Sequence, residues 1–140
     1  MNKQVIQISL EQAQRITLFK QQLMVLPPGK GKMAALATIE QLGYLQIDTL
    51  NVITRAHHHT LWSRLNDYKE CYLNELLEKD KQIFEYWSHA ASYLPMADFR
   101  FSLPRKKLYA DGKSHWFEQD KKMNKYVLDK IKAEGPLQSK

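Results

Sequence analysis

The spacing of hydrophobic residues predicts two helices in the first third of the chain. Ser9 followed by Gln12 has the pattern of a helix-capping box, and apolar side chains continue at helical spacing to about residue 26. Pro27-Pro28-Gly29 then ends the helix. A second helix is expected from about residue 32, followed by Gly43 in the left-handed conformation. Its expected buried side consists of Met33, Leu36, Ile39 and Leu42.

Polar and apolar residues alternate over residues 45–48, which predicts an extended strand. Successive side chains of a strand point to opposite faces, so Gln46 and Asp48 share one face while Leu45 and Ile47 share the other. A carboxylate and an amide placed side by side can hold a water molecule or face a developing positive charge. The alternative is that Asp48 only caps the turn before Asn51, and spacing alone favours this alternative.

Beyond residue 50 the pattern predicts two short helices and then a β-hairpin. The helices carry their apolar residues at 56–65 and 72–77 and are separated by Asn66-Asp67. Two β-prone runs, 83–87 and 91–94, are joined by Ser88-His89. Pro104 and Asp111-Gly112 are expected to interrupt the chain before a last helix over residues 114–134. The sequence therefore predicts a mainly α fold with a small β-hairpin, the outline of a winged helix-turn-helix.

Composition limits the class of protein. With 140 residues, 44% of them hydrophobic, the chain can build one modest core. It has no apolar run long enough for a membrane span and no secretory signal at its Met-Asn-Lys-Gln start, so we expect a cytoplasmic protein that binds no membrane. Cys71 lies in a leucine-rich segment and is expected to be a small buried hydrophobe.

Positive charge is concentrated near the end of the chain. Residues 1–99 carry ten Lys and Arg against ten Asp and Glu, whereas residues 100–140 carry eleven against five. This asymmetry indicates an anionic partner, and a nucleic acid contacted through its phosphates is one interpretation. A solvated helix face explains the charge equally well. The candidate phosphate contacts are Arg100, Arg105, Lys106, Lys107, Lys113, Lys121, Lys122 and Lys125.

The histidine residues are expected near an active site and the aromatic residues in the core. His57, His58 and His59 are consecutive, so on a helix they point about 100° apart and do not converge on one ion; we expect no metal site. His57, His58 and His89 are instead candidates for a polar layer around an active cleft, or for phosphate contact when protonated. His89 has the further alternative of satisfying the hairpin turn. The aromatic side chains are expected in the core rather than on a base-stacking surface. They are Trp62, Tyr86, Trp87 and Tyr93.

Four sequence blocks, in this order and at similar spacing, resemble the N-terminal part of the YcaQ-type winged-helix DNA glycosylases, also called alkylpurine and interstrand-crosslink glycosylases. They are Gln46-Ile47-Asp48-Thr49, Arg55-Ala56-His57-His58, Leu61-Trp62-Ser63-Arg64, and Phe84-Glu85-Tyr86-Trp87-Ser88-His89-Ala90-Ala91-Ser92. The likeness covers most of residues 9–137. Members of this family build tandem winged-helix modules followed by a C-terminal β-barrel, and they are much longer than this chain.

The resemblance implies hydrolysis of the N-glycosidic bond of alkylated or crosslinked bases in double-stranded DNA, with Gln46 and Asp48 as catalytic residues and no cofactor. The family site reads Gln-x-Gln or Gln-x-Asp, and the form found here is associated with the crosslink and broader-substrate branch. Arg55 and Arg64 are candidate DNA contacts because guanidinium binds phosphate in a bidentate way, although either could instead pair with Asp67 or Glu85.

The same likeness suggests a domain plan. Residues 1–103 would form a first winged-helix module with the Gln46-x-Asp48 site, and residues 104–140 a basic connecting segment and long helix that end at the start of a second module. Such an N-terminal portion is expected to be weakly active or inactive by itself, and the full-length protein to be a monomer associated with the bacterial nucleoid. The competing function is a non-catalytic winged-helix DNA-binding module or regulator, which shares the fold without the chemistry.

Overall fold

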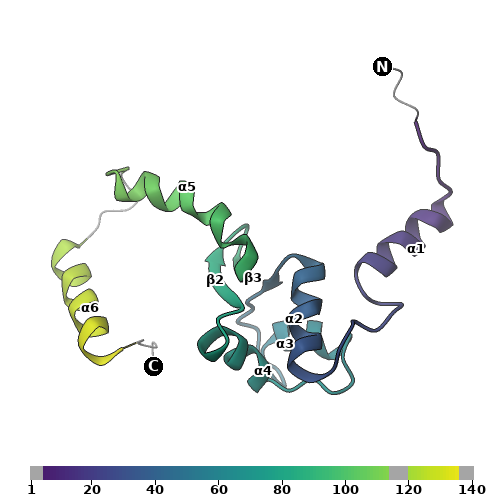
Figure 1. The fold of residues 1–140 in the computed structure, drawn as a ribbon, viewed down its shortest axis with the longest axis horizontal. Helices are drawn as coiled ribbons and strands as arrows, with labels where there is room; N and C mark the ends of the chain where they lie inside the picture. Colours follow the sequence, from purple (N-terminus) through teal and green to yellow (C-terminus); the bar gives the residue numbers. More distant parts are fainter. Residues whose placement is uncertain (1–4, 114–119, 136–140) are drawn as a thin grey trace. The chain divides into compact units, whose positions relative to one another are not determined.

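The computed structural model describes residues 5–113 and 120–135 of the chain. Its elements, in chain order, are α1 (Leu10–Lys20), α2 (Gly31–Leu42), β1 (Leu45–Gln46), α3 (Ala56–Trp62), α4 (Cys71–Asn74), the π-helical turn η1 (Glu75–Lys79), β2 (Ile83–Trp87), β3 (Ala91–Pro95), the 3₁₀ turn η2 (Met96–Asp98), α5 (Phe99–Ala110) and α6 (Lys121–Glu134) (Figure 1). The chain divides into two compact units, Met1–Ser102 and Leu103–Lys140. Their identity as a first module and a connecting segment stays a prediction.

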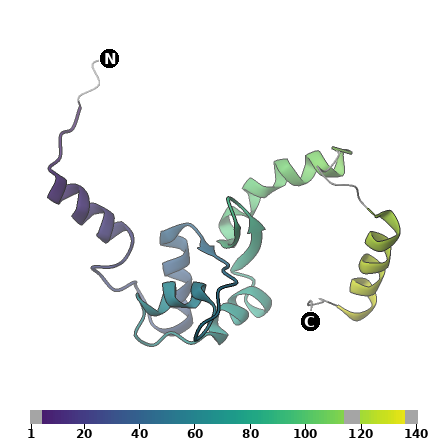
Figure 2. The same ribbon diagram turned by 180° about the vertical axis from the view of Figure 1, so that it is seen from behind.

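The predicted fold class is confirmed, because the described residues are mainly helical and carry one small antiparallel sheet. The sheet has the strand order β1-β3-β2, with Gln46 opposite Ser92 and Tyr86 opposite the same serine on the other side. Figure 2 shows the same ribbon from behind. The predicted hairpin forms its β2 and β3 strands. This arrangement is consistent with a winged-helix-like fold, whereas the specific helix-turn-helix assignment stays a prediction.

Helix α1 begins where the sequence predicts and ends earlier. Ser9 Oγ accepts the N–H of Gln12, and the Gln12 side chain accepts the N–H of Ser9, so the expected capping box is present. The helix was expected to reach residue 26 but stops at Lys20. Gln22 has a φ of 53°, and the N–H of Leu23 bonds to the carbonyl of Leu18, which is the left-handed stop found at many helix ends.

Residues 99–110 form a helix that the sequence pattern did not predict. Pro104 was expected to break the chain, yet it lies inside α5. A proline in a helix removes one hydrogen bond, and here Leu, Arg, Lys and Ala residues around it favour the helical conformation. The start of α5 is held by Phe99, whose ring meets that of Phe84 edge to face at 5.1 Å.

The last helix begins later than expected. Asp120 is extended and caps α6, because its Oδ1 accepts the N–H groups of Lys122 and Met123. Residues 114–119 of the predicted helix lie outside the described residues.

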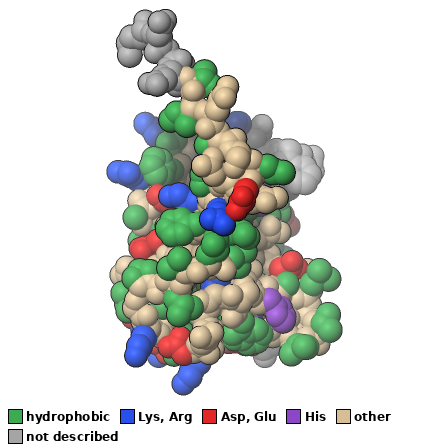
Figure 3. All heavy atoms as spheres, turned by 90° about the vertical axis from the view of Figure 1, so that its right-hand side faces the viewer, with side chains coloured by type: hydrophobic (Ala, Val, Ile, Leu, Met, Phe, Trp, Pro, Cys, Tyr) green, Lys and Arg blue, Asp and Glu red, His purple; other side chains and the backbone are tan. Residues whose placement is uncertain are grey.

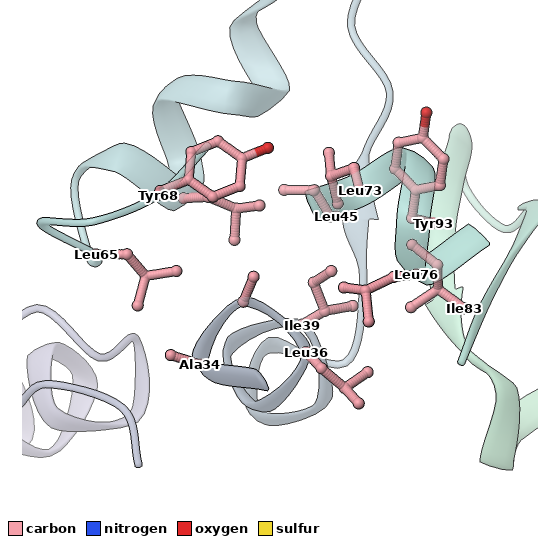
Figure 4. Close-up of a cluster of buried hydrophobic side chains, with 12 residues drawn as sticks. Ala34, Leu36, Ile39, Leu45, Leu65, Tyr68, Leu73, Leu76, Ile83 and Tyr93 are labelled. Carbon is pink, nitrogen blue, oxygen red and sulfur yellow. The ribbon is translucent and has the colours of Figure 1, made fainter. Parts of the chain in front are cut away.

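The hydrophobic core lies in the first unit, where α2 faces α3, α4, η1 and the sheet (Figure 4). Ile39, Leu61 and Leu76 are completely buried, and Leu45 of β1 is 2% exposed. The core is made of Ala34, Ala35, Leu36, Ile39, Leu45, Leu61, Leu65, Tyr68, Leu73, Leu76, Ile83 and Tyr93. Lys32 of α2 forms ion pairs with Glu75 and Asp80 beside this core.

Four side chains expected in the core are exposed instead. Trp62, the last residue of α3, is 37% exposed. Cys71 is the first residue of α4 and lies off the face that buries Leu73. Met33 is 60% exposed because α2 buries the side that carries Ala34, Ala35 and Thr38. Trp87 is 63% exposed at the hairpin end of β2, beyond the core, whereas Tyr93 is buried as expected.

Hydrophobic side chains also remain on the surface, interspersed with Lys and Arg (Figure 3). The structure describes all of α1 and α6, and neither helix has a buried residue. The most exposed apolar pair, Val52 and Ile53, lies in the loop between β1 and α3.

Candidate active site

Gln46 and Asp48 line one cleft of about 370 Å³ beside the short strand β1. Leu45 is buried and Gln46 exposed, while Ile47 packs against the core, so the alternation predicted for this segment is present. Strand β1 itself ends at Gln46. The cleft is completed by Gln21, Tyr44, His57, Thr60 and Arg64, together with nearby aliphatic side chains.

Asp48 uses one carboxylate oxygen to hold the chain that follows it. Its Oδ1 accepts the N–H of Leu50 at 2.8 Å, a local turn of the kind that short acidic side chains make. Among the residues that the structure describes, Oδ2 has no hydrogen-bond donor. Asp48 therefore contributes to both the turn and the cleft. Its Oδ1 fixes the backbone, and its Oδ2 is available to a ligand.

His57 lies behind Asp48 and is 4% exposed. Its Nδ1 accepts the backbone N–H of Asp48 in a long hydrogen bond of 3.4 Å, which requires a neutral ring. Burial lowers the pKa of His57 to about 4, and the nearby positive charges of His58 and Arg55 act in the same direction. His57 thus supports the Asp48 backbone as an uncharged ring at neutral pH.

This lowered pKa predicts that the fold loses stability in mild acid. The unfolded chain binds a proton at His57 near its ordinary pKa of 6.5, whereas the folded chain resists protonation down to about 4. The stabilisation is therefore fully present above pH 6.5 and lost as the pH falls toward 4, and the loss between pH 7.5 and pH 5 is on the order of 2 kcal/mol. Urea unfolding followed by circular dichroism at pH 7.5 and pH 5 measures this difference.

The matched variants are His57→Asn and His89→Asn, since His89 is exposed on the hairpin. The His57 variant should have a smaller change in unfolding free energy between the two pH values than the parent protein, and the His89 variant should keep the parent's change. An equal pH dependence in all three proteins would show that His57 does not carry the effect.

Arg64 faces the cleft but is engaged by the protein itself. Its Nε donates to the carbonyl of Gln21 and its Nη1 to the carbonyl of Thr60, both at 2.8 Å. Burial lowers its pKa. Within the described part of the chain it makes no ion pair with Asp67 or Glu85. Arg64 therefore joins the segment after α1 to α3, and contact with DNA stays a prediction.

Arg55 and His58 line a second cleft, of about 330 Å³, next to the first. His57 lines both clefts. His58 contacts the Tyr68 hydroxyl at 2.7 Å and lies 3.7 Å from the Glu70 carboxylate. Burial lowers the pKa of His58, and the charge of Glu70 opposes this effect. His58 was predicted to lie around the active cleft. It belongs instead to a polar network with Tyr68 and Glu70, next to the loop that follows Asp48.

The remaining predicted residues lie elsewhere. The ring of His89 meets that of Tyr44 edge to face at 4.9 Å, so His89 reaches the edge of the first cleft through a side chain that lines it. The predicted phosphate contacts on α5 and α6 are all exposed: Arg105, Lys106, Lys107, Lys121, Lys122 and Lys125. They belong to the second unit, and their role in DNA binding stays a prediction.

No group of three or more His, Cys, Asp or Glu side chains in the described residues is arranged to hold a metal ion. In the same residues, no helix is long and apolar enough to cross a bilayer.

Sequence reasoning missed several residues of the cleft. Tyr44 could have been found, because it precedes Gln46 and Asp48 at the same two-residue spacing. Gln21 gives no such signal, since it reaches the cleft only through tertiary contacts such as its hydrogen bond with Arg64.

Comparison with known families identifies the relationship of the chain. The model of the family described as DNA glycosylase AlkZ-like matches residues 39–140, which include the cleft residues from Leu42 to Arg64 and both basic helices. No solved structure matches the chain. The resemblance noted in the sequence is thereby confirmed, and the chain belongs to the AlkZ-like family of DNA glycosylases.

Proposed function

We propose that this protein hydrolyses the N-glycosidic bond of alkylated or crosslinked bases in double-stranded DNA, with Asp48 as the catalytic carboxylate. The observation that carries the proposal is the position of Asp48, which lines the cleft beside Gln46 with one oxygen unengaged by the described residues. Membership of a DNA glycosylase family supports the reaction class. The catalytic roles and the lesion are proposals.

The cleft residues suit the charge changes of this reaction. As the bond between the base nitrogen and C1′ breaks, the electron pair leaves with the base and C1′ becomes positively charged. A carboxylate near C1′ stabilises this charge and accepts a proton from the attacking water, whose oxygen forms the new bond to C1′. A base alkylated on a ring nitrogen carries a positive charge, so the electron pair makes it neutral and it leaves without being protonated. The proton taken from water passes from Asp48 to solvent.

Gln46 and His57 are assigned supporting roles. The Gln46 amide can donate to and accept from a water molecule at once, so it is placed to hold that water near Asp48. His57 supports the Asp48 backbone through Nδ1. We regard His57 as a positioning residue, because it is uncharged at neutral pH and its only described contact with Asp48 is with the main chain.

Double-stranded DNA suits the distribution of charge. The exposed cations of α5 and α6 give the second unit its positive charge, and Arg55 adds an exposed cation close to the site. Phosphate contacts of this kind hold a duplex without reading its sequence, as expected for an enzyme that searches for rare lesions.

The test is release of the modified base from duplex DNA carrying one alkylated purine or one interstrand crosslink, measured with the full-length protein. We expect release from at least one of the two substrates and none from the undamaged duplex. A regulator would release no base and would prefer particular sequences, so sequence-specific binding without base release would contradict the proposal.

A further inference from the structure

We propose that Val52 and Ile53 form an apolar wedge that enters double-stranded DNA between neighbouring base pairs, next to the nucleotide placed at Asp48. The inference rests on the proposed function and adds to it a way of exposing the base. It concerns the loop of residues 47–55, between β1 and α3.

The two side chains are unusually exposed for their type. Val52 is 94% exposed and Ile53 is 85% exposed, and Leu50 of the same loop is 69% exposed. Apolar side chains in a tight turn contribute nothing to the core when they project in this way, and turns usually carry polar residues. A contact outside the described chain explains their presence better than folding does.

The loop that presents them is held at its base. The N–H of Ala56 donates to the carbonyl of Leu50 at 3.0 Å, and Asn51 and Arg55 form an antiparallel bridge inside this closure. Val52, Ile53 and Thr54 are therefore the tip of a closed turn. A tip fixed at both ends can push into a base stack without first losing much conformational freedom.

A side-chain hydrogen bond also holds the tip to the folded core. Thr54 Oγ1 donates to Glu70 Oε1 at 2.8 Å, and Glu70 precedes α4 of the folded core. His58 lies between Glu70 and the Tyr68 hydroxyl. The side of the loop that faces Glu70 is thus polar and hydrogen-bonded, while Val52 and Ile53 do not pack into the core that the described residues form.

The distance along the chain suits a wedge beside the cleft. Asp48 Oδ1 accepts the N–H of Leu50, so the side chain that lines the cleft also fixes the start of the loop that carries Val52 and Ile53. Val52 lies four positions after Asp48, and an extended chain of four residues spans at most about 14 Å. The wedge therefore lies within a few base steps of any nucleotide bound at Asp48.

DNA is the occupant that the surroundings favour. Arg55 follows the tip directly and is exposed, so a phosphate contact is available beside the inserted side chains. Aliphatic wedges inserted at a base step unstack it, and a glycosylase must take its target base out of the stack before the bond to the sugar can be reached. Val and Ile suit this role because their branched side chains are compact and stiff.

The experiment compares two pairs of identical residues. Val52→Ser with Ile53→Ser removes the wedge, and Val5→Ser with Ile6→Ser is the matched control, because that pair is 81% and 85% exposed and precedes α1 in the chain. The probe is a duplex containing 2-aminopurine beside an alkylated purine, since its fluorescence rises when the base unstacks. Binding is followed by anisotropy and base release by product analysis, all with the full-length protein.

We expect the parent protein and the Val5/Ile6 variant to raise the 2-aminopurine fluorescence on binding. The Val52/Ile53 variant should lose most of this rise, and its base release from duplex should fall by about tenfold or more while release from a single-stranded lesion changes little. A third variant, Val52→Leu with Ile53→Leu, should restore the rise, because it keeps the apolar volume.

Several results would overturn the wedge. They are an unchanged fluorescence rise in the Val52/Ile53 variant, an equal loss in the Val5/Ile6 variant, no rise with the parent protein, or a change confined to self-association in sedimentation. The proposed function fails separately, if the parent protein releases no base from either duplex or single-stranded lesions. Base release that is lost with Asp48 and unaffected by Val52 and Ile53 would keep the glycosylase and remove only the wedge.

Discussion

Replacing Asp48 by Asn should lower base release by about a hundredfold or more while leaving the affinity for DNA unchanged or slightly higher. The reason is that Asn keeps the oxygen that accepts the N–H of Leu50, so the turn is preserved and only the negative charge is lost. A carboxylate near phosphates weakens ground-state binding and becomes favourable only as the sugar acquires positive charge. The measurement is single-turnover base release together with binding by anisotropy.

Two further variants separate the fold from the chemistry. Gln46→Ala should reduce base release less, by about tenfold, because it removes hydrogen bonds to water and no charge. Asp48→Ala should lose activity and also stability, since it removes the acceptor for Leu50. Full activity of Asp48→Asn would refute the assignment of Asp48 and favour a binding module.

The second large effect concerns the basic helix α6. Changing Lys121, Lys122 and Lys125 together to Gln should flatten the dependence of log affinity on log salt concentration by about 3, if each side chain neutralises one phosphate. All three are exposed on one helix of the second unit. The measurement is DNA affinity between 50 and 200 mM salt.

The matched control is Lys69, Lys79 and Lys81 changed to Gln, which removes the same charge from exposed positions of the first unit. This control should shift affinity slightly and keep the parent slope. If both triple variants have the same slope, net charge alone determines binding, and α6 is a solvated face.

The parts of this structure that could be predicted from sequence are those set by local periodicity. Alternation over residues 45–48 placed Gln46 and Asp48 toward one cleft, and the two β-prone runs gave the hairpin. The capping box at Ser9 was also local, because both of its hydrogen bonds lie within four residues.

The remaining features depend on contacts between distant segments. Helix α5 continues through Pro104. Its first residue, Phe99, packs on Phe84 of β2, and no local sequence pattern predicts this contact. Gln21 joins the cleft through Arg64, more than forty positions away. Trp87 is exposed because it lies at the hairpin end of β2, and Cys71 because it lies off the buried face of α4. The hydrophobicity of a residue alone does not determine its position relative to the core.

The turn at Asp48 also limits which amino acids can occupy that position. Closing the turn requires an acceptor oxygen one bond or two beyond Cβ, which Asp, Asn, Ser and Thr supply. The proposed chemistry requires a negative charge at neutral pH, which Asp and Glu supply. Asp alone is common to both groups, so in this chain one side chain meets a requirement of the loop and a requirement of the proposed reaction, and a replacement that keeps only one of them separates folding from catalysis.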